Sequence, residues 1–331
     1  MTDRRIDILD GWRALSILLV LAGHWLPIGP KAWGLNGAVA ATGMVLFFNL
    51  SGFLITRLLF SDPRVLNFLI RRVFRIVPLA WVAMLILMVW NGADFRTLLA
   101  NLLFFSNLPP QHLFAGGEHL WSLCVEMQFY MGVALLVSLA GKRALYALPV
   151  IAIAVTLLRV WQGATISIVT WQRVDEILAG ATVALLFNSP AASARIRKLP
   201  AITPLLILPI VFAAAHPATG PLNYLRPYLA AAAMGISLFS APEAMVRLFR
   251  SRAAVYVAAT SYALYVVHAM LAASWLGSGE KLVKYAKRPL LIVLTFAIAH
   301  LSTFHFEARM IGLGKKLAIR WAGERRASPA G

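Results

Sequence analysis

Two ionisable residues, Arg13 and His24, lie within the first apolar stretch of the chain, which reads DILDGWRALSILLVLAGHWLP from Asp7 to Pro27. At about 100° per residue, an α-helix would place them within roughly 20° of one another and about 16 Å apart along its axis. Either residue alone fits a structural role, with Arg13 reaching toward a polar surface and His24 satisfied inside the fold. As a pair on one apolar face, they favour a functional site.

A second candidate group lies in the segment GGEHLWSLCVEMQFYMG. His119, Ser122 and Glu126 are spaced by three and four positions, so a helix presents them on one face. A histidine beside a carboxylate in an apolar environment can be oriented and made basic enough to take a proton from a hydroxyl group. We interpret Ser122 and Glu126 as catalytic candidates together with His24. The alternative is a structural hydrogen-bond cluster.

A basic group follows the second apolar stretch, in the sequence NFLIRRVFRIVPLAW. Arg71 and Arg75 are four positions apart and Arg72 and Arg75 are three apart, so a helix lets them converge on one anionic ligand. The forked guanidinium donors of arginine suit phosphate groups. The alternative is that these arginines only set the orientation of the chain in a membrane.

Two further segments, RVDEILAG and SYALYVVH, carry polar residues within apolar sequence. Asp175 begins a predicted helix, where a carboxylate is favoured by the helix dipole alone, and His268 lies inside another. Cys124 is the only cysteine, which excludes an intrachain disulfide and a metal site built from cysteine clusters. The chain has no nucleophile elbow, Walker loop or HExxH motif. We predict neither a metal site nor a bound cofactor.

Composition places the chain among membrane proteins. Hydrophobic residues make up 60% of its 331 residues and charged residues 13%, compared with about 25% charged residues in soluble domains. The net charge of +18 would suit a nucleic-acid-binding protein only if the basic residues were interleaved with aromatic residues on one accessible surface. They are instead concentrated in short segments between apolar stretches. We therefore predict an all-α polytopic membrane protein that binds no nucleic acid.

The apolar stretches predict a bundle of about ten transmembrane helices. Their ranges are 8–27, 36–60, 76–92, 119–140, 144–161, 170–187, 203–215, 227–241, 254–276 and 289–306. With both termini in the cytoplasm, cytoplasmic segments hold twenty of the thirty-one basic residues, which fits the positive-inside rule. The outer segments hold seven, namely Lys31, Arg96, Arg226, Lys281, Lys284, Lys287 and Arg288.

The predicted topology also fixes the depth of the candidate residues. His24 and Ser122 lie about one turn below the outer surface, and Glu126 and His268 about two turns below it. The arginines 71, 72 and 75 lie at the cytoplasmic end. We predict one membrane domain over residues 1–316 and a basic cytoplasmic tail over 317–331, with 188–200 a loop and the long outer segment 93–118 irregular.

Several motifs in sequence order carry a resemblance to a known family. They are Arg13 with His24, FFNLSGFLITRLL, RRVFRIVP, HLWSLCVEMQFY, RVDEILAG, SYALYVVH and a closing FEARMIGLGKK. Together they resemble the integral-membrane type 3 acyltransferases, the bacterial O-acyltransferases and O-acetylases that modify surface glycans. Two departures are Met127, where many relatives have a second acid, and Ala308 and Arg309 after Glu307, near the proline expected of the family.

The resemblance implies roles for individual residues. His24 is the expected catalytic base and Arg13 its partner, while Arg72 and Arg75 match a basic motif at the cytoplasmic face. The HLWSLCVEMQFY segment supplies residues that match the family's tryptophan, serine, glutamate, glutamine and tyrosine, namely Trp121, Ser122, Glu126, Gln128 and Tyr130.

The implied activity is transfer of an acyl group, usually acetyl, from cytoplasmic acyl-CoA (acetyl-CoA) to a hydroxyl of a glycan or glycolipid at the bacterial inner membrane. Two alternatives remain at this point. A secondary transporter also places ionisable residues in a helical bundle, although we see no related halves of the kind that transporters commonly have. A noncatalytic membrane partner in glycan assembly is the other.

Overall fold

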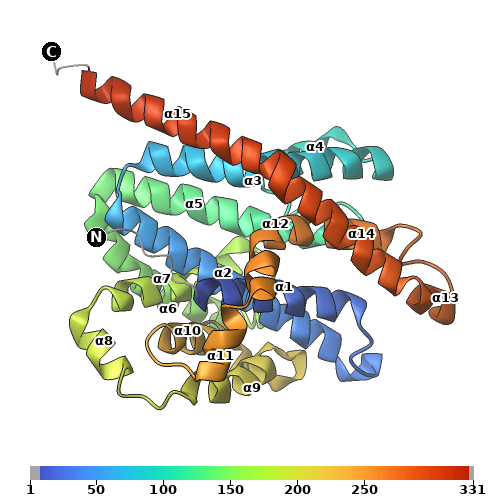
Figure 1. Ribbon diagram of the computed structural model, residues 1–331, viewed down its shortest axis with the longest axis horizontal. Coiled ribbons are helices and arrows are strands. Elements are labelled where there is room, and N and C mark those ends of the chain that lie inside the picture. Colours follow the sequence, from blue (N-terminus) through green and yellow to red (C-terminus); the bar gives the residue numbers. More distant parts are fainter. Residues whose placement is uncertain (1–7, 328–331) are drawn as a thin grey trace. The chain divides into compact units, whose positions relative to one another are not determined.

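The computed structural model describes residues 8–327, with side chains up to Trp321, and over these residues it contains helices and no strand (Figure 1). The predicted cytoplasmic N-terminus, with Arg4 and Arg5, lies outside the described residues. The helices are α1 (Ile8–Trp25), α2 (Leu35–Ser61), α3 (Val65–Asn91), α4 (Phe95–Leu102), α5 (Trp121–Ala140), α6 (Leu148–Trp161), α7 (Asp175–Phe187), α8 (Pro190–Ile196), α9 (Thr203–Ala215), α10 (Arg226–Ser237), α11 (Glu243–Phe249), α12 (Arg252–Ala273), α13 (Lys281–Ala286), α14 (Arg288–Leu301) and α15 (Ala308–Ala327). A π-helical turn, Ser302–Glu307, joins α14 to α15.

Each of the ten predicted segments contains a helix, but the helices differ in length. Within the described residues, six are long and apolar enough to cross a membrane: Leu35–Ser61, Val65–Asn91, Glu118–Ala140, Lys142–Trp161, Arg252–Ala273 and Arg288–Trp321. By contrast, α7 and α9 have 13 residues each and α10 has 12, fewer than the roughly 20 that a span needs. The all-helical, multi-pass class is confirmed. The count of ten spans and the cytoplasmic placing of both termini stay predictions.

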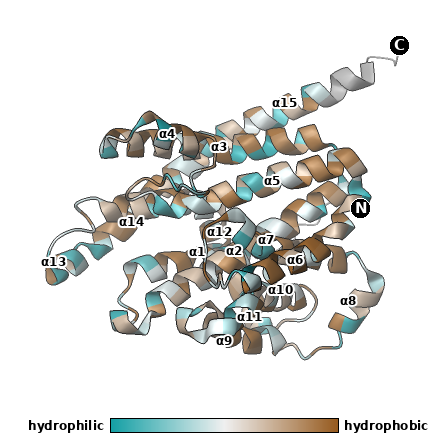
Figure 2. Ribbon diagram, turned by 180° about the vertical axis from the view of Figure 1, so that it is seen from behind, coloured by the Kyte–Doolittle hydropathy of each residue, from teal (hydrophilic) through white to brown (hydrophobic). Residues whose placement is uncertain are grey.

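An exposed apolar face on α6 supports the membrane assignment. Val150, Ile153 and Leu157 are 68%, 55% and 62% exposed, and their spacing of three and four places them on one stripe of the helix. Figure 2 shows the apolar colour over most of α6. Because hydrocarbon tails are as apolar as these side chains, a lipid environment covers such a stripe without cost.

The chain folds into two compact units, each built from two segments. Unit 1 comprises residues 1–57 and 146–261, and unit 2 comprises 58–145 and 262–331. Two boundaries therefore fall within α2 and α12, and the third falls between α5 and α6.

Unit 1 is organised by close contacts of α2 with α1 and α7. Ser16 of α1 donates a hydrogen bond to the carbonyl of Gly43 in α2, at 2.8 Å. A Cβ atom at Gly52 would lie 1.8 Å from the carbonyl oxygen of Ile177, and one at Gly180 would lie 1.9 Å from that of Asn49. Glycine is therefore required at this crossing, as in the small-residue contacts typical of membrane helices.

Unit 2 is organised around α3, which packs against α4, α5 and α15. Phe74 lies where a side chain at Gly314 would be, 2.6 Å from the position of its Cβ, so α3 and α15 approach closely at this point. Tyr262 of α12 donates a hydrogen bond to the carbonyl of Ile76, at 2.5 Å. Figure 1 shows α14 and α15 crossing α3 obliquely as one long helical rod.

Three segments predicted as loop or tail contain helix. Residues 95–102 form α4, where the Asp94 carboxylate accepts the Thr97 amide at 2.9 Å. Hydrogen bonds from the side chain and the amide of Thr97 lower the pKa of Asp94. Residues 190–196 form α8, capped in the same way by Ser189. Asp and Ser are strongly preferred N-cap residues, so the local sequence marks where each of these two helices begins. Residues 317–327 of the predicted tail continue α15, and residues 328–331 lie outside the described part of the chain.

Candidate functional site

Helix α1 carries the first pair of candidate residues in unit 1. It is uninterrupted from Ile8 to Trp25, so the spacing of Arg13 and His24 does place them on one helix face. His24 is exposed, whereas its neighbours Gly23 and Trp25 are buried. The imidazole is thus accessible to a ligand.

Arg13 has an acidic neighbour that the sequence analysis did not identify. The guanidinium lies 3.5 Å from the carboxylate of Asp10, one turn earlier on α1. Asp10 is 6% exposed, and a nearby opposite charge stabilises a guanidinium in such a place. The i,i+3 spacing of the two residues was the available signal.

The second group lies in unit 2 and links α5 to α3. Tyr130 donates a hydrogen bond to Glu126, one turn earlier on α5, at 2.5 Å. Arg72 of α3 places its guanidinium carbon 5.9 Å from the ring centres of both Phe68 and Tyr130. This is the distance range of cation–π attraction. Glu126, Tyr130 and Arg72 therefore form one polar cluster within unit 2.

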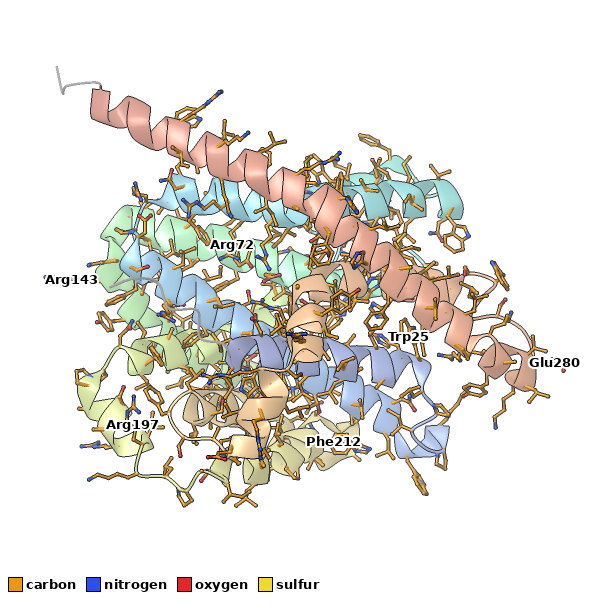
Figure 3. The ribbon with its side chains drawn as sticks, in the orientation of Figure 1. Trp25, Arg72, Arg143, Arg197, Phe212 and Glu280 are labelled. Carbon is orange, nitrogen blue, oxygen red and sulfur yellow. The ribbon has the colours of Figure 1, made fainter. Side chains whose placement is uncertain are left out.

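The three predicted donor-binding arginines have different environments. Arg72 is half-buried, whereas Arg71 and Arg75 are exposed on α3. Figure 3 shows Arg72 among the helices of unit 2 and Arg143 at their edge. An arginine that only oriented the chain in the membrane would not need to pack against aromatic rings. The environment of Arg72 therefore favours a further role for this residue.

Ser122 belongs to a chain of hydroxyl groups between α5 and α12. Tyr265 donates to the backbone carbonyl of His119, so the 2.6 Å contact between Ser122 and Tyr265 has Ser122 as donor to the phenol oxygen. The Ser122 proton is thereby held within the protein. This arrangement favours an orienting role for Ser122 over a nucleophilic one.

His268 lies beside the same hydroxyl chain and is fully buried. Its Nδ1 is 2.7 Å from the carbonyl of Tyr265, and its ring centre is 4.9 Å from that of His119. Because a carbonyl only accepts, Nδ1 of His268 carries a proton and donates it to this carbonyl. The sequence analysis placed His119 and His268 in separate motifs, and the structure brings their rings together.

Two other residues of the HLWSLCVEMQFY segment have different positions. Trp121 begins α5 and is half-buried. Gln128 donates to the carbonyl of Phe104 at 2.7 Å and to the side chain of Asn107 at 3.0 Å. It therefore attaches the segment after α4 to α5, which is a structural role.

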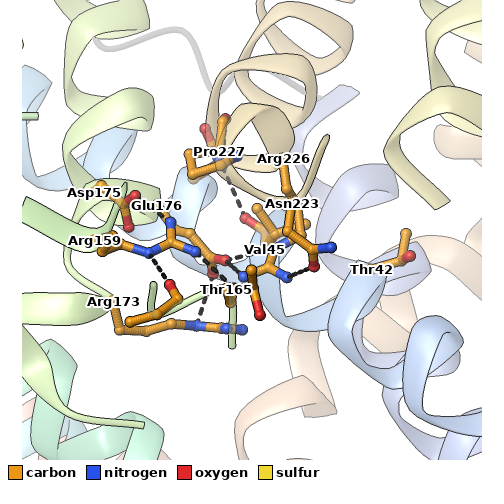
Figure 4. Close-up of polar contacts among 12 residues, drawn as sticks. Thr42, Val45, Arg159, Thr165, Arg173, Asp175, Glu176, Asn223, Arg226 and Pro227 are labelled. Carbon is orange, nitrogen blue, oxygen red and sulfur yellow. Dashed lines mark hydrogen bonds and ion pairs between the residues drawn. The ribbon is translucent and has the colours of Figure 1, made fainter. Parts of the chain in front are cut away.

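Asp175 lies in a buried charge cluster in unit 1 (Figure 4). Its carboxylate is 2.5 Å from Arg159, and the neighbouring Glu176 contacts Arg226 at 2.7 Å and Arg173 at 3.2 Å. The exposed fraction of all five side chains is 3% or less. The cluster joins α6, α7 and α10.

The sequence analysis missed two members of this cluster. Arg159 falls within the predicted span 144–161 and Arg226 was assigned to an outer segment, yet both are fully buried. Their pairing depends on contacts between helices that are distant in sequence. Buried ion pairs add little net stability compared with apolar residues of similar size, so their presence inside a membrane protein favours a functional or orienting role.

Within the described residues, no group of three or more His, Cys, Asp or Glu side chains is placed to hold a metal ion. The single cysteine, Cys124, is buried, with its sulfur 3.4 Å from the Ser106 hydroxyl.

Comparison with known proteins identifies the family. The chain is 27% identical over 150 residues to the peptidoglycan O-acetyltransferase OatA of Listeria monocytogenes, covering 38% of this chain and 23% of the relative. It is 26% identical over 160 residues to nodulation protein 10 of Rhizobium leguminosarum, covering 40% and 44%. It is 30% identical over 151 residues to a putative O-acetyltransferase of Staphylococcus aureus, covering 39% and 24%.

These matches span less than half the length of each relative, and no solved structure matches the chain. A family model described as an acyltransferase domain matches residues 6–305. That range includes the α1 pair, the three α3 arginines, the α5 residues and the buried charge cluster. The chain therefore belongs to this acyltransferase family.

Proposed function

We propose that the protein is a membrane O-acyltransferase that moves an acetyl group from cytoplasmic acetyl-CoA to a hydroxyl of a cell-surface glycan or glycolipid. The observation that carries the proposal is the accessible His24, which shares one face of α1 with Arg13 in a chain of the acyltransferase family. Two relatives named as O-acetyltransferases support acetyl as the group transferred. The peptidoglycan named for one of them supports a glycan acceptor.

In the proposed reaction, the neutral imidazole of His24 takes the proton of the acceptor hydroxyl. The hydroxyl oxygen then attacks the thioester carbonyl, an ester bond forms, and the bond from carbon to sulfur breaks. The proton passes from the imidazolium to the departing CoA thiolate, so charge and atoms balance. Arg13, held by Asp10, supplies a positive charge on the same helix face about 16 Å from His24, a position that would suit the phosphate end of the donor rather than the reacting carbonyl.

The donor is proposed to bind through arginines of α3. Arg71 and Arg75 are exposed and Arg72 is packed between Phe68 and Tyr130, so the group offers both accessible and fixed guanidinium donors for phosphate. The positive-inside count supports a cytoplasmic position for them, where CoA is available. This supports a bacterial inner-membrane location.

Binding and transfer of acetyl-CoA by the purified protein test the proposal. Calorimetric titration of CoA should show affinity that falls with salt, and the double variant R72Q/R75Q should lose both the affinity and its salt dependence. R143Q/R195Q, which removes two exposed arginines elsewhere, is the control. CoA affinity unchanged in R72Q/R75Q would mean that these arginines only enforce topology. Mass spectrometry of surface glycans with and without the gene would identify the acceptor.

A further inference from the structure

The long helical rod from Arg288 to Trp321 exceeds the thickness of a membrane. It contains 34 residues, or about 51 Å of helix, whereas the hydrocarbon core is about 30 Å thick. Starting from Arg288, about 20 residues cross the core, so the rod leaves it close to Glu307. The first residues of α15 therefore lie at the level of the lipid headgroups.

Packing against α3 gives a second estimate of this boundary, about six to ten residues further along α15. Figure 1 shows α15 crossing α3 obliquely, with the two chains running in opposite directions, and the helices touch where Phe74 meets Gly314. Counting from this contact, Arg75 lies about level with Leu313 and Arg71 about level with Leu317. The first cation of α15, Arg309, lies four residues before this level, so the two helices change from apolar to basic sequence within about one turn of one another, as expected near the surface of a bilayer.

Three basic residues of α15 form a stripe on its outer side. Arg309, Lys316 and Arg320 are exposed, and at 100° per residue they lie within about 40° of one another. Gly314 and Ala318, which are buried, lie roughly 140° and 180° from Arg309 on the side that meets α3. The stripe therefore points away from α3 and from its arginines.

Apolar side chains accompany this stripe. Leu313 is 50% exposed and borders the stripe, and Ile319, 65% exposed, lies about 60° beyond its other edge. Trp321, 46% exposed, lies about 120° from Arg309. Such a mixture suits the headgroup region, where aliphatic stems and indole rings contact acyl chains while cations reach phosphate.

We propose that Arg309, Lys316 and Arg320 form a binding surface for the phosphate groups of anionic phospholipids. The charge of the stripe complements these headgroups. The stripe begins close to where the rod is expected to leave the hydrocarbon core, and it points away from α3. The surface is separate from the proposed donor site, so it does not depend on the donor being CoA.

Native mass spectrometry of the purified protein with added phosphatidylglycerol or phosphatidylcholine tests this surface. The wild type should bind phosphatidylglycerol more tightly than phosphatidylcholine, and R309Q/K316Q/R320Q should bind phosphatidylglycerol at least about tenfold more weakly. The charge-conserving R309K/R320K should retain binding. R195Q/K198Q/R247Q, which removes three exposed cations from other segments predicted to be cytoplasmic, should also retain it.

Three results would overturn the proposal. They are equal affinity of the wild type for the two lipids, an equal loss in R195Q/K198Q/R247Q, and displacement of the bound lipid by CoA, which would assign the stripe to the donor. If the triple variant does not fold, K316Q/R320Q alters two exposed side chains only and should still weaken phosphatidylglycerol binding several-fold.

Discussion

Asp175→Asn should destabilise unit 1 strongly, because it removes one of the two carboxylates that balance three buried arginines. Arg159 and Asp175 are both 0% exposed and 2.5 Å apart. Removing one partner of such a pair leaves an uncompensated buried charge and costs about 3–5 kcal/mol. Net folding stabilities are only about 5–15 kcal/mol, so the expected loss is a large share of the total.

The double variant R159Q/D175N separates charge imbalance from loss of contacts. It buries no unpaired guanidinium, so it should be more stable than D175N by about 1–3 kcal/mol. Recovery should be incomplete, since Arg159 also donates to the carbonyls of Ala164 and Thr165, at 3.2 and 2.7 Å, and a glutamine side chain is shorter. Thermal unfolding followed by circular dichroism measures the stabilities, and hydrogen exchange over α7 locates the change.

The exposed pair of Asp62 and Arg64 provides the matched control. Their charged atoms are 2.7 Å apart, but the side chains are 33% and 57% exposed. Arg64 lowers the pKa of Asp62 through a hydrogen bond, yet solvent screens such pairs and their net effect is small. D62N should therefore unfold close to the wild-type temperature. A stability of D175N indistinguishable from that of D62N, or a double variant no more stable than D175N, would refute the reasoning.

Three further predictions concern catalysis and packing. His24→Ala should lower acyl transfer by about 10²–10⁴-fold with CoA binding kept; a variant retaining more than about a tenth of wild-type turnover would rule out His24 as the base. Glu126→Gln should lower turnover and move the pH optimum if the carboxylate acts on the imidazole, whereas a weaker CoA affinity at an unchanged optimum would assign it to Arg72. Gly180→Val should prevent correct packing of α2 on α7, because even a Cβ there would lie 1.9 Å from the Asn49 carbonyl oxygen; wild-type levels of membrane-inserted, active protein would contradict this.

The sequence predicted most of the helices but not their lengths. Hydropathy identifies apolar segments, and each predicted segment contains a helix. It does not predict how far α3 extends before the span at Ile76, or that α14 continues through a π-helical turn into α15, because these extensions are amphipathic and depend on packing between the two helices. The segments that form the short helices α7, α9 and α10 were also predicted to span the membrane, because apolar sequence alone does not show where a buried helix ends.

Pairing across helices was the part of the site that sequence could not predict. The i,i+3 and i,i+4 rules anticipated Ser122 and Glu126 on one face, and the same rules would have found Asp10 beside Arg13. They could not join Arg159 to Asp175 or Arg226 to Glu176, because these contacts connect three helices. The roles of the predicted catalytic and donor-binding residues stay predictions.

Glu126 shows why this distinction matters for mechanism. The sequence analysis paired Glu126 with His24 because both residues were expected at a similar depth, near the outer surface. The structure gives the carboxylate a 2.5 Å hydrogen bond from Tyr130, and the ring of Tyr130 lies against Arg72. A carboxylate joined through a tyrosine to a guanidinium stabilises positive charge at Arg72 and holds it in one orientation. Glu126 therefore has a structural connection to the proposed donor site that depth did not predict. A change in donor affinity in the Glu126→Gln variant would assign Glu126 to donor binding, whereas a change in the pH dependence of transfer would assign it to proton transfer.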